Sequence, residues 1–166
     1  MTARAVARRG EIFPGATLQD IDGSAIVLES YRGQTNLVVV CAADKMEERP
    51  VSVLLEELAA RKDELTSEAA QVLVAVTSRP AAAPERGRLA FPVLVDEGSY
   101  LHLSVGATDA TGRPAPAVFV TDRFREIFAA YLTGRGSALP GAKDVLDWLV
   151  FINIQCPECG VPEWPT

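Results

Sequence analysis

A continuous apolar segment that runs into an amphipathic helix is the feature of this sequence that most restricts its fold. Residues 37–41 are apolar, rich in β-branched valine, and show no polar alternation. This composition is typical of a strand that is covered on both faces of a sheet. In residues 53–65 apolar side chains recur every three or four positions with charged side chains between them, which predicts a helix. Residues 36–65 therefore predict a strand–helix unit, with Pro50 in the first turn of the helix.

Further segments extend this unit into an α/β protein with a mixed sheet. Residues 72–76 form a second continuous apolar strand, and two such strands joined by a helix predict a parallel, right-handed βαβ unit. Residues 117–121 and 126–132 predict two antiparallel strands across a turn. Residues 143–154 predict a terminal helix that packs on the sheet.

The length of the chain indicates one domain. With 166 residues it can bury roughly two thirds of its unfolded surface, so no disulfide scaffold is needed. We expect a mobile lead at residues 1–10 and a single domain at residues 11–155. The tail at residues 156–166 is apolar and aromatic, which predicts that it packs on this domain or on a partner.

The charge balance argues against two classes of partner. Twenty-two acidic and sixteen basic residues give a net charge of −6, which would repel both nucleic acid and an anionic membrane surface. The apolar runs are too short to cross a bilayer, and residues 1–10 lack the apolar core of a signal peptide. Three cysteines are more typical of an intracellular thiol or metal pattern than of a secreted framework, so we expect a cytoplasmic protein.

A hairpin is predicted ahead of the central strand, and a family resemblance begins there. Asp22 and Gly23 stand between two short alternating segments, as expected of a tight primed turn. Over roughly residues 13–154 the chain resembles the alkyl hydroperoxide reductase and thiol-specific antioxidant group of thioredoxin-fold proteins. The residues that carry the resemblance, besides the second strand pair, are Phe13, Pro14, Asp22, Gly23, Leu28, Tyr31, Arg32, Gly33, Phe91, Pro92, Val93, Leu94, Val95 and Asp96.

The resemblance implies a thioredoxin-like three-layer sandwich with a mixed central sheet and an N-terminal hairpin. It places the strand at residues 36–41 in the middle of the sheet. It also implies a cis peptide bond at Pro116, which would face the redox site.

The resemblance also implies a reactive cysteine at the start of the first long helix, where the dipole and free N–H groups stabilise a thiolate. This sequence has no cysteine between Asp44 and Leu58, and the family's peroxidatic threonine is missing as well. A polar cluster occupies this degenerate position, and such clusters are more often solvated helix caps than pockets. Its members are Asp44, Lys45, Met46, Glu47 and Glu48.

Two other candidates for chemistry are weak. Cys41 is the nearest thiol, but at the end of an apolar strand a cysteine is usually inert packing. His102 is the only histidine and therefore the only possible base of a Cys/His/Asp triad. Its place among apolar neighbours is typical of ordinary helix packing.

The sharper signal is a Cys-Pro-Glu-Cys-Gly motif at residues 156–160, for which three interpretations remain open. As a redox pair, Cys156 and Cys159 resemble the Cys-Pro-x-Cys of glutaredoxin-like sites, although the dipole at a helix C-terminus disfavours a thiolate. As a metal knuckle, they resemble half of a zinc ribbon, which two chains would complete across a twofold axis. The third interpretation is a free or locally disulfide-bonded tail.

We expect a redoxin that, if active, is an antioxidant or thiol–disulfide oxidoreductase with its chemistry at Cys156 and Cys159. It would use a thiol reductant and a disulfide or peroxide substrate, and it would require no cofactor. The alternative is a non-catalytic binding module in which the tail has a structural role, either through zinc shared between two chains or through simple packing. The apolar tail also favours a homodimer.

Overall fold

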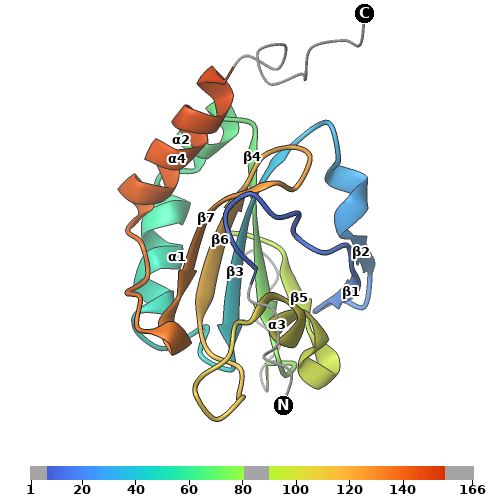
Figure 1. The fold of residues 1–166 in the computed structure, drawn as a ribbon. Helices are drawn as coiled ribbons and strands as arrows, with labels where there is room; N and C mark the ends of the chain where they lie inside the picture. The colour runs from blue at the N-terminus through green and yellow to red at the C-terminus, as the bar shows by residue number, and fades with distance from the viewer. Residues whose placement is uncertain (1–6, 81–89, 156–166) are drawn as a thin grey trace, which may run out of the picture.

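The computed structural model describes residues 7–80 and 90–155 of the chain. It contains a seven-stranded mixed sheet with the strand order β2-β1-β5-β4-β3-β6-β7 (Figure 1). The strands are β1 (Thr17–Asp20), β2 (Ala25–Val27), β3 (Asn36–Ala43), β4 (Ala70–Val76), β5 (Val93–Val95), β6 (Ala117–Thr121) and β7 (Ile127–Leu132). The helices are α1 (Val51–Ala60), α2 (Lys62–Ser67), α3 (Tyr100–Val105) and α4 (Ala142–Ile154), and the 3-10 turns are η1 (Leu28–Tyr31), η2 (Glu97–Ser99) and η3 (Thr133–Arg135).

The valine-rich segment forms β3, and all of its residues are buried. This strand pairs parallel with β4 and antiparallel with β6, so that Val38 lies opposite both Val72 and Val120. The strand predicted in the middle of the sheet lies inside it, one position from the middle strand, β4. Its predicted connection through a helix to a parallel neighbour is confirmed.

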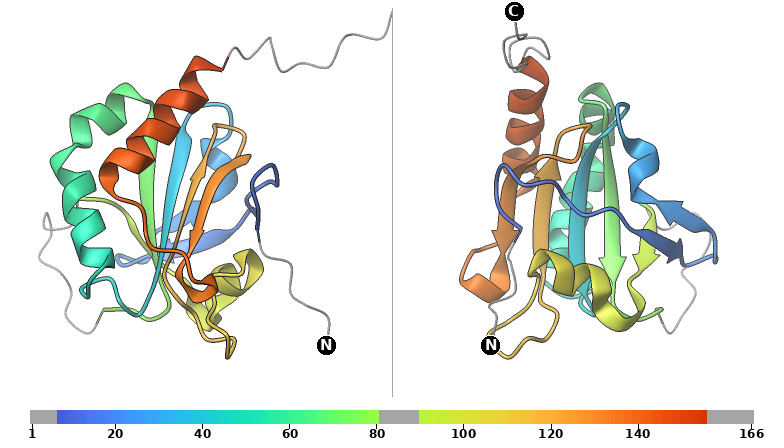
Figure 2. Two further views of the ribbon diagram at one scale, coloured as in Figure 1. Left: turned by 60° about the vertical axis from the view of Figure 1, so that its left-hand side comes forward. Right: turned by 45° about the vertical axis from the view of Figure 1, so that its right-hand side comes forward.

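Alternate side chains of β3 divide the core into two layers, because successive residues of a strand point to opposite faces. Val38 and Val40 pack with the apolar faces of α1, α2 and α4. Leu37 and Val39 pack with α3 and with N-terminal segments. Figure 2 shows α1, α2 and α4 on one side of the sheet and α3 on the other. The predicted three-layer, thioredoxin-like α/β sandwich is therefore confirmed.

The helix predicted at residues 53–65 is interrupted. α1 and α2 are separated by Arg61, which leaves the helical region with φ −114° and ψ 29°. The N–H of Arg61 bonds to the carbonyl of Leu58 in a tight closing turn. Leu58 and Leu65 are both buried, so the apolar period continues across the break and the sequence pattern does not reveal it.

The hairpin of β1 and β2 is confirmed, but its turn is wider than the predicted primed turn. Residues 21–24 connect the two strands. Asp20 Oδ1 accepts hydrogen bonds from the N–H groups of Asp22 at 2.9 Å and Ser24 at 2.8 Å. Gly23 supplies the left-handed conformation, with φ +87°. The carboxylate of Asp20 thus helps to close a four-residue connection.

The predicted cis peptide bond at Pro116 is wrong. Within residues 7–80 and 90–155 the one cis peptide bond joins Arg49 to Pro50. The peptide bond before Pro116 is trans, and Pro116 leads directly into β6. The carbonyl of Pro116 accepts hydrogen bonds from the backbone N–H and the hydroxyl of Thr133, at 3.1 and 2.7 Å. Pro116 thereby extends the pairing of β6 with β7 at the end of the sheet.

Candidate functional site

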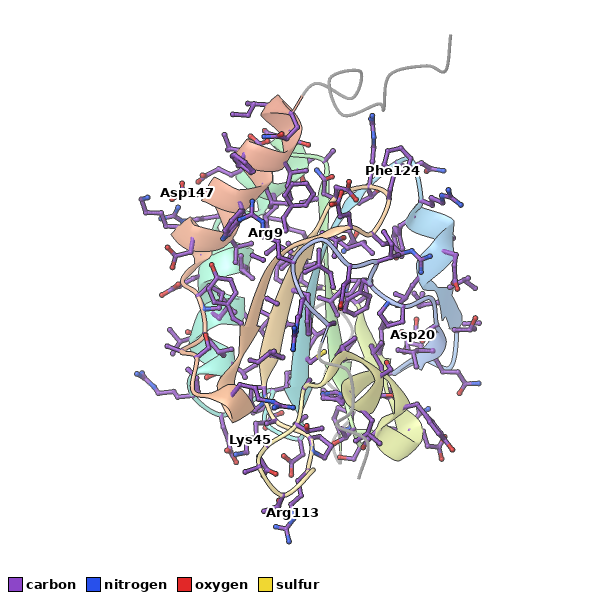
Figure 3. All side chains as sticks on the ribbon, viewed as in Figure 1. Arg9, Asp20, Lys45, Arg113, Phe124 and Asp147 are labelled. Atoms are coloured by element: carbon purple, nitrogen blue, oxygen red, sulfur yellow. The ribbon has the colours of Figure 1, made fainter. Side chains whose placement is uncertain are left out.

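The carboxyl ends of β3, β4 and β5 lie at one edge of the sheet. In open α/β sheets, ligands bind in the crevice beyond this edge. Here the edge consists of the β3–α1 loop at residues 44–50, Thr77 after β4 and Asp96 after β5. In Figure 3, Lys45 marks this end of the molecule. Ala117, the residue after Pro116, pairs with Cys41 at the same edge.

The β3–α1 loop contains the predicted polar cluster and presents its charges to solvent. Within the cluster, Met46 is half-buried against the helix-side core, whereas the other four members are exposed: Asp44, Lys45, Glu47 and Glu48. Turns close the loop, with the N–H of Lys45 on the carbonyl of Ala42 and the N–H of Glu48 on the carbonyl of Lys45. The loop is therefore a charged surface that contains no thiol, hydroxyl or imidazole group.

Cys41 lies inside the sheet, two residues before the end of β3. Its side chain is fully buried in the α3-side core. Burial, and after it the negative charge of Asp96, raises the pKa of the Cys41 thiol far above its ordinary value. A thiol of this kind remains protonated at neutral pH and is a poor nucleophile.

A buried Asp–His pair closes the end of β3. His102 Nδ1 lies 2.7 Å from Asp96 Oδ2, and both side chains are fully buried. The other ring nitrogen, Nε2, lies 3.0 Å from the backbone nitrogen of Ala43. A backbone N–H can only donate, so Nε2 is the unprotonated acceptor and Nδ1–H donates to the carboxylate. Both ring nitrogens are occupied, and His102 has no free nitrogen with which to act as the base of a triad.

Asp96 also caps the start of α3. Its carboxylate accepts the backbone N–H groups of Leu101 and His102, each at 2.9 Å. Burial acts to raise the pKa of Asp96, but the hydrogen bonds from the His102 side chain and from these two N–H groups outweigh burial and lower the pKa below its ordinary value. Asp96 is therefore ionised at neutral pH and ties α3 to the end of β3 through His102.

Ala43 is the point at which the chain leaves the sheet and enters the polar loop. It has φ +53°, a left-handed conformation that residues with a Cβ seldom adopt. Its N–H donates to His102, and its carbonyl accepts the N–H of Thr77 at 2.9 Å. The Asp96–His102 pair therefore positions the loop and supplies no reacting group to it.

Sequence reasoning missed this pair. His102 is buried on α3 as predicted, but it forms a polar connection between α3 and β3. The available signal was an aspartate six residues before a histidine, on either side of a helix start, with apolar neighbours around the histidine. The residue to which the second ring nitrogen would bond, Ala43, could not be identified from the sequence.

Two grooves flank the carboxyl ends of β3, β4 and β5. One, of about 360 Å³, borders the polar cluster on the α1 side and is lined by Met46, Glu47 and Phe91, among others. The other, of about 800 Å³, lies between β1 and α3 and includes Arg79, whose Nη1 donates to the carbonyl of Ile21 at 2.9 Å. In the described part of the chain, no three histidine, cysteine or acidic side chains come together as a metal site.

Cys156 and Cys159 lie outside the described residues. α4 ends at Ile154, two residues before Cys156. The prediction that they form a redox pair or a metal knuckle, and that the tail packs on the domain, stays a prediction.

The mixed sheet with helices on both faces defines the chain as a thioredoxin-like α/β protein. Residues 9–130 match the AhpC/TSA family, and the chain belongs to that family. No curated protein sequence matches it.

Several solved structures share the fold. AhpC from Mycobacterium bovis has a TM-score of 0.71 at 20% identity, over 90% of this chain and 99% of that chain. The thiol peroxidase from Chromobacterium violaceum has a TM-score of 0.67 at 18% identity, over 92% and 91%. Peroxidoxin BcpB from Mycobacterium tuberculosis has a TM-score of 0.65 at 18% identity, over 88% and 98%. At these identities the likeness shows the fold alone.

Proposed function

We propose that this protein is an antioxidant redoxin or thiol–disulfide oxidoreductase whose thiol chemistry takes place at Cys156 and Cys159, outside the degenerate β3–α1 loop. The burial of Cys41 is the observation that carries the proposal. The chain has three cysteines. One of them is fully buried with a raised pKa, so the other two are the candidates for a reactive thiolate. Membership of the AhpC/TSA family supports a redox-related role in general terms.

The proposed reaction is a dithiol–disulfide exchange. The Cys156 thiolate attacks one sulfur of a substrate disulfide, which forms a mixed disulfide and releases the other sulfur as a thiolate that takes up a proton. The Cys159 thiolate then attacks the Cys156 sulfur, releases the second substrate thiol and leaves a Cys156–Cys159 disulfide. Two electrons pass to the substrate, and a dithiol reductant restores them without a cofactor.

A peroxide substrate would follow the same electron balance. The Cys156 thiolate attacks the peroxide oxygen, forms a sulfenic acid and releases water or an alcohol. Condensation of the sulfenic acid with the Cys159 thiol releases water and forms the same disulfide.

The test is steady-state turnover of a peroxide and of a small disulfide with a dithiol reductant. We expect Cys156→Ser and Cys159→Ser to abolish turnover. Cys41→Ala is the matched control, because it removes the buried thiol, and we expect it to retain the wild-type kcat/KM. Absence of turnover in the wild type, or unchanged turnover in the Cys156→Ser/Cys159→Ser double variant, would overturn the enzyme proposal.

A non-catalytic binding module is the second candidate, and the groove beside Met46 favours it. This groove has an apolar floor that includes Phe91 and Val93, whereas Glu47 and Glu56 supply negative charge. The Lys62 ammonium already lies 5.9 Å from the centroid of the Phe91 ring. A concave apolar surface with few charged groups is typical of small-molecule sites, and here an uncharged apolar molecule would suit it. Saturable binding of such a molecule, lost in Phe91→Ala, together with absence of turnover, would favour this function.

The tail also motivates the proposals on assembly and metal binding. In the alternative to the redox pair, Cys156 and Cys159 of two chains hold one zinc ion, with zinc–sulfur distances of about 2.3 Å. A homodimer assembled in this way would dissociate on addition of a chelator, whereas a disulfide-linked dimer would dissociate with a reductant. Light scattering with each additive, and the metal content per chain, distinguish the two cases. A monomer that carries no metal and responds to neither additive would contradict both.

The cellular location of the protein and its partners are the last part of the proposal. Within the described residues, no helix combines the length and apolar character that a membrane span requires. We propose a cytoplasmic protein that meets a thiol reductant there. The net charge of −6 supports the proposal that it binds neither nucleic acid nor anionic membranes.

A further inference from the structure

A groove of about 590 Å³ follows the outer edge of β7. β7 is the last strand of the sheet, and the N-terminal segment covers only its start, through hydrogen bonds between Ile127 and residues 10–11. In the described part of the chain, the rest of this edge pairs with no strand. The residues that line the groove belong to the N-terminal segment, to β7 and to α4, with Arg135 just after β7.

Aromatic side chains form one wall of the groove. Trp148 on α4 is half-buried, and its Nε1–H donates to the hydroxyl of Tyr131 on β7 at 2.9 Å. Phe151 packs edge-on against Trp148 with ring centroids 5.8 Å apart, and it extends the aromatic surface toward the end of α4. The hydrogen bond to Tyr131 and the contact with Phe151 hold the Trp148 ring in place, so the aromatic wall of the groove is preorganised for binding.

The groove is strongly basic in an acidic protein. Arg8, Arg9 and Arg135 line it, all three are exposed, and no acidic side chain is among the described residues that line it. The guanidinium of Arg9 lies over the Trp148 ring, 5.2 Å from the ring centroid. A ligand that suits this groove is therefore acidic and contains aromatic or proline residues.

The C-terminal tail of this chain has that chemistry. Residues 156–166 contain Glu158 and Glu163, three prolines and Trp164, and they contain no basic residue. Proline-rich segments bind aromatic-lined grooves at a low entropic cost because they are already extended.

The tail also has the necessary reach. Trp148 lies six residues before the end of α4, which corresponds to a rise of about 9 Å along the helix. Eleven extended residues span up to about 36 Å, so the tail can turn back at the end of α4 and run along β7.

We propose that residues 161–166 occupy this groove in the same chain. Trp164 lies against Trp148 and Tyr131, and Glu163 faces Arg9 and Arg135. This docking would hold the Cys156–Cys159 segment near the end of α4. It does not depend on whether the two thiols react, so its failure and the failure of the proposed redox function are distinguishable.

The test measures the order parameters of the two indole N–H groups in the full-length protein by NMR relaxation. The Trp148 indole, which is hydrogen-bonded to Tyr131, provides the reference value for a fixed ring. We expect the Trp164 indole to have an order parameter of about 0.85, as for rigid backbone, and to show nuclear Overhauser effects to Tyr131. An order parameter below about 0.6 would overturn the proposal. A mixture of labelled and unlabelled chains tests the assignment to the same chain, because contacts seen only between chains would make a second copy the occupant.

Charge reversal provides a matched comparison. Arg9→Glu combined with Arg135→Glu should release Trp164 and lower its order parameter. Arg32→Glu combined with Arg113→Glu makes the same change in net charge at exposed positions outside the groove and should leave Trp164 fixed. All four side chains are exposed, so we expect both variants to fold, which backbone amide spectra would verify. Equal responses of the two variants would contradict docking through the arginines.

Discussion

The side chains of Asp96 and His102 form a fully buried pair in which Oδ2 and Nδ1 are 2.7 Å apart. The second nitrogen of His102 accepts the N–H of Ala43, the residue that leads into the β3–α1 loop. A polar network that connects α3 to the end of the central strand therefore supports the degenerate position of this AhpC/TSA-family protein. Such a network stabilises a structure only while all its members are paired.

Replacement of His102 by alanine should be strongly destabilising. The change leaves the buried Asp96 carboxylate without the hydrogen bond from Nδ1–H and the Ala43 N–H without its acceptor, and each buried polar group left unpaired typically costs about 1–3 kcal/mol, with more for a charged group. Chemical denaturation would measure this loss in the free energy of unfolding. Tyr100→Ala is the matched control on α3, since Tyr100 is 78% exposed and surface substitutions stay within about 0.5 kcal/mol. A loss equal to that of the control would contradict the structural role of the pair.

Asp96 should make stability dependent on acid pH. Its pKa is lowered from the ordinary 3.8, so its contribution is complete above that value and is lost as the pH falls through the lower folded-state pKa. Asp96→Asn should cost about 1–3 kcal/mol at neutral pH, because the Asn amide cannot accept all the hydrogen bonds that the carboxylate accepts. Denaturation curves between pH 7 and pH 2 should show the difference from wild type narrowing below pH 3.8. A difference that stays constant over this range would contradict the lowered pKa.

Cys41 should resist alkylation in the native protein. Burial excludes the reagent, and the raised pKa keeps the thiol protonated. Mass spectrometry after treatment of the reduced protein with iodoacetamide should show rapid modification at Cys156 and Cys159. Cys41 should be modified only when denaturant is added. Modification of Cys41 at the rate of the other two would contradict its buried position.

Most of the fold could be predicted from the sequence because its signals are local and agree with one another. The valine-rich run of β3 and the apolar period of α4 each predict one element, and the right-handed crossover rule then fixes how β3 and β4 pair. The break at Arg61 was missed because the apolar face continues through it. The wide hairpin turn was missed because the carboxylate of Asp20, two residues before Asp22, helps to close it.

Less of the site could be predicted, because its geometry depends on contacts between elements far apart in the chain. The sequence places the charged cluster after β3, and the structure places it in the β3–α1 loop. The sequence does not reveal that His102 accepts a hydrogen bond from the backbone N–H of Ala43, 59 residues away. The cis bond expected at Pro116 came from the family resemblance alone, and in the structure a trans Pro116 pairs with Thr133.

The most direct test of the central proposal is to locate the oxidised thiols after a single turnover. Fully reduced protein is mixed with one equivalent of peroxide, quenched by acid, and mapped by mass spectrometry of non-reduced peptides. The same experiment is repeated with one equivalent of a small disulfide. We predict one intramolecular disulfide between Cys156 and Cys159, with Cys41 still reduced, for at least one of the two oxidants. Oxidation at Cys41, or three thiols that remain reduced with both oxidants, would contradict the proposal.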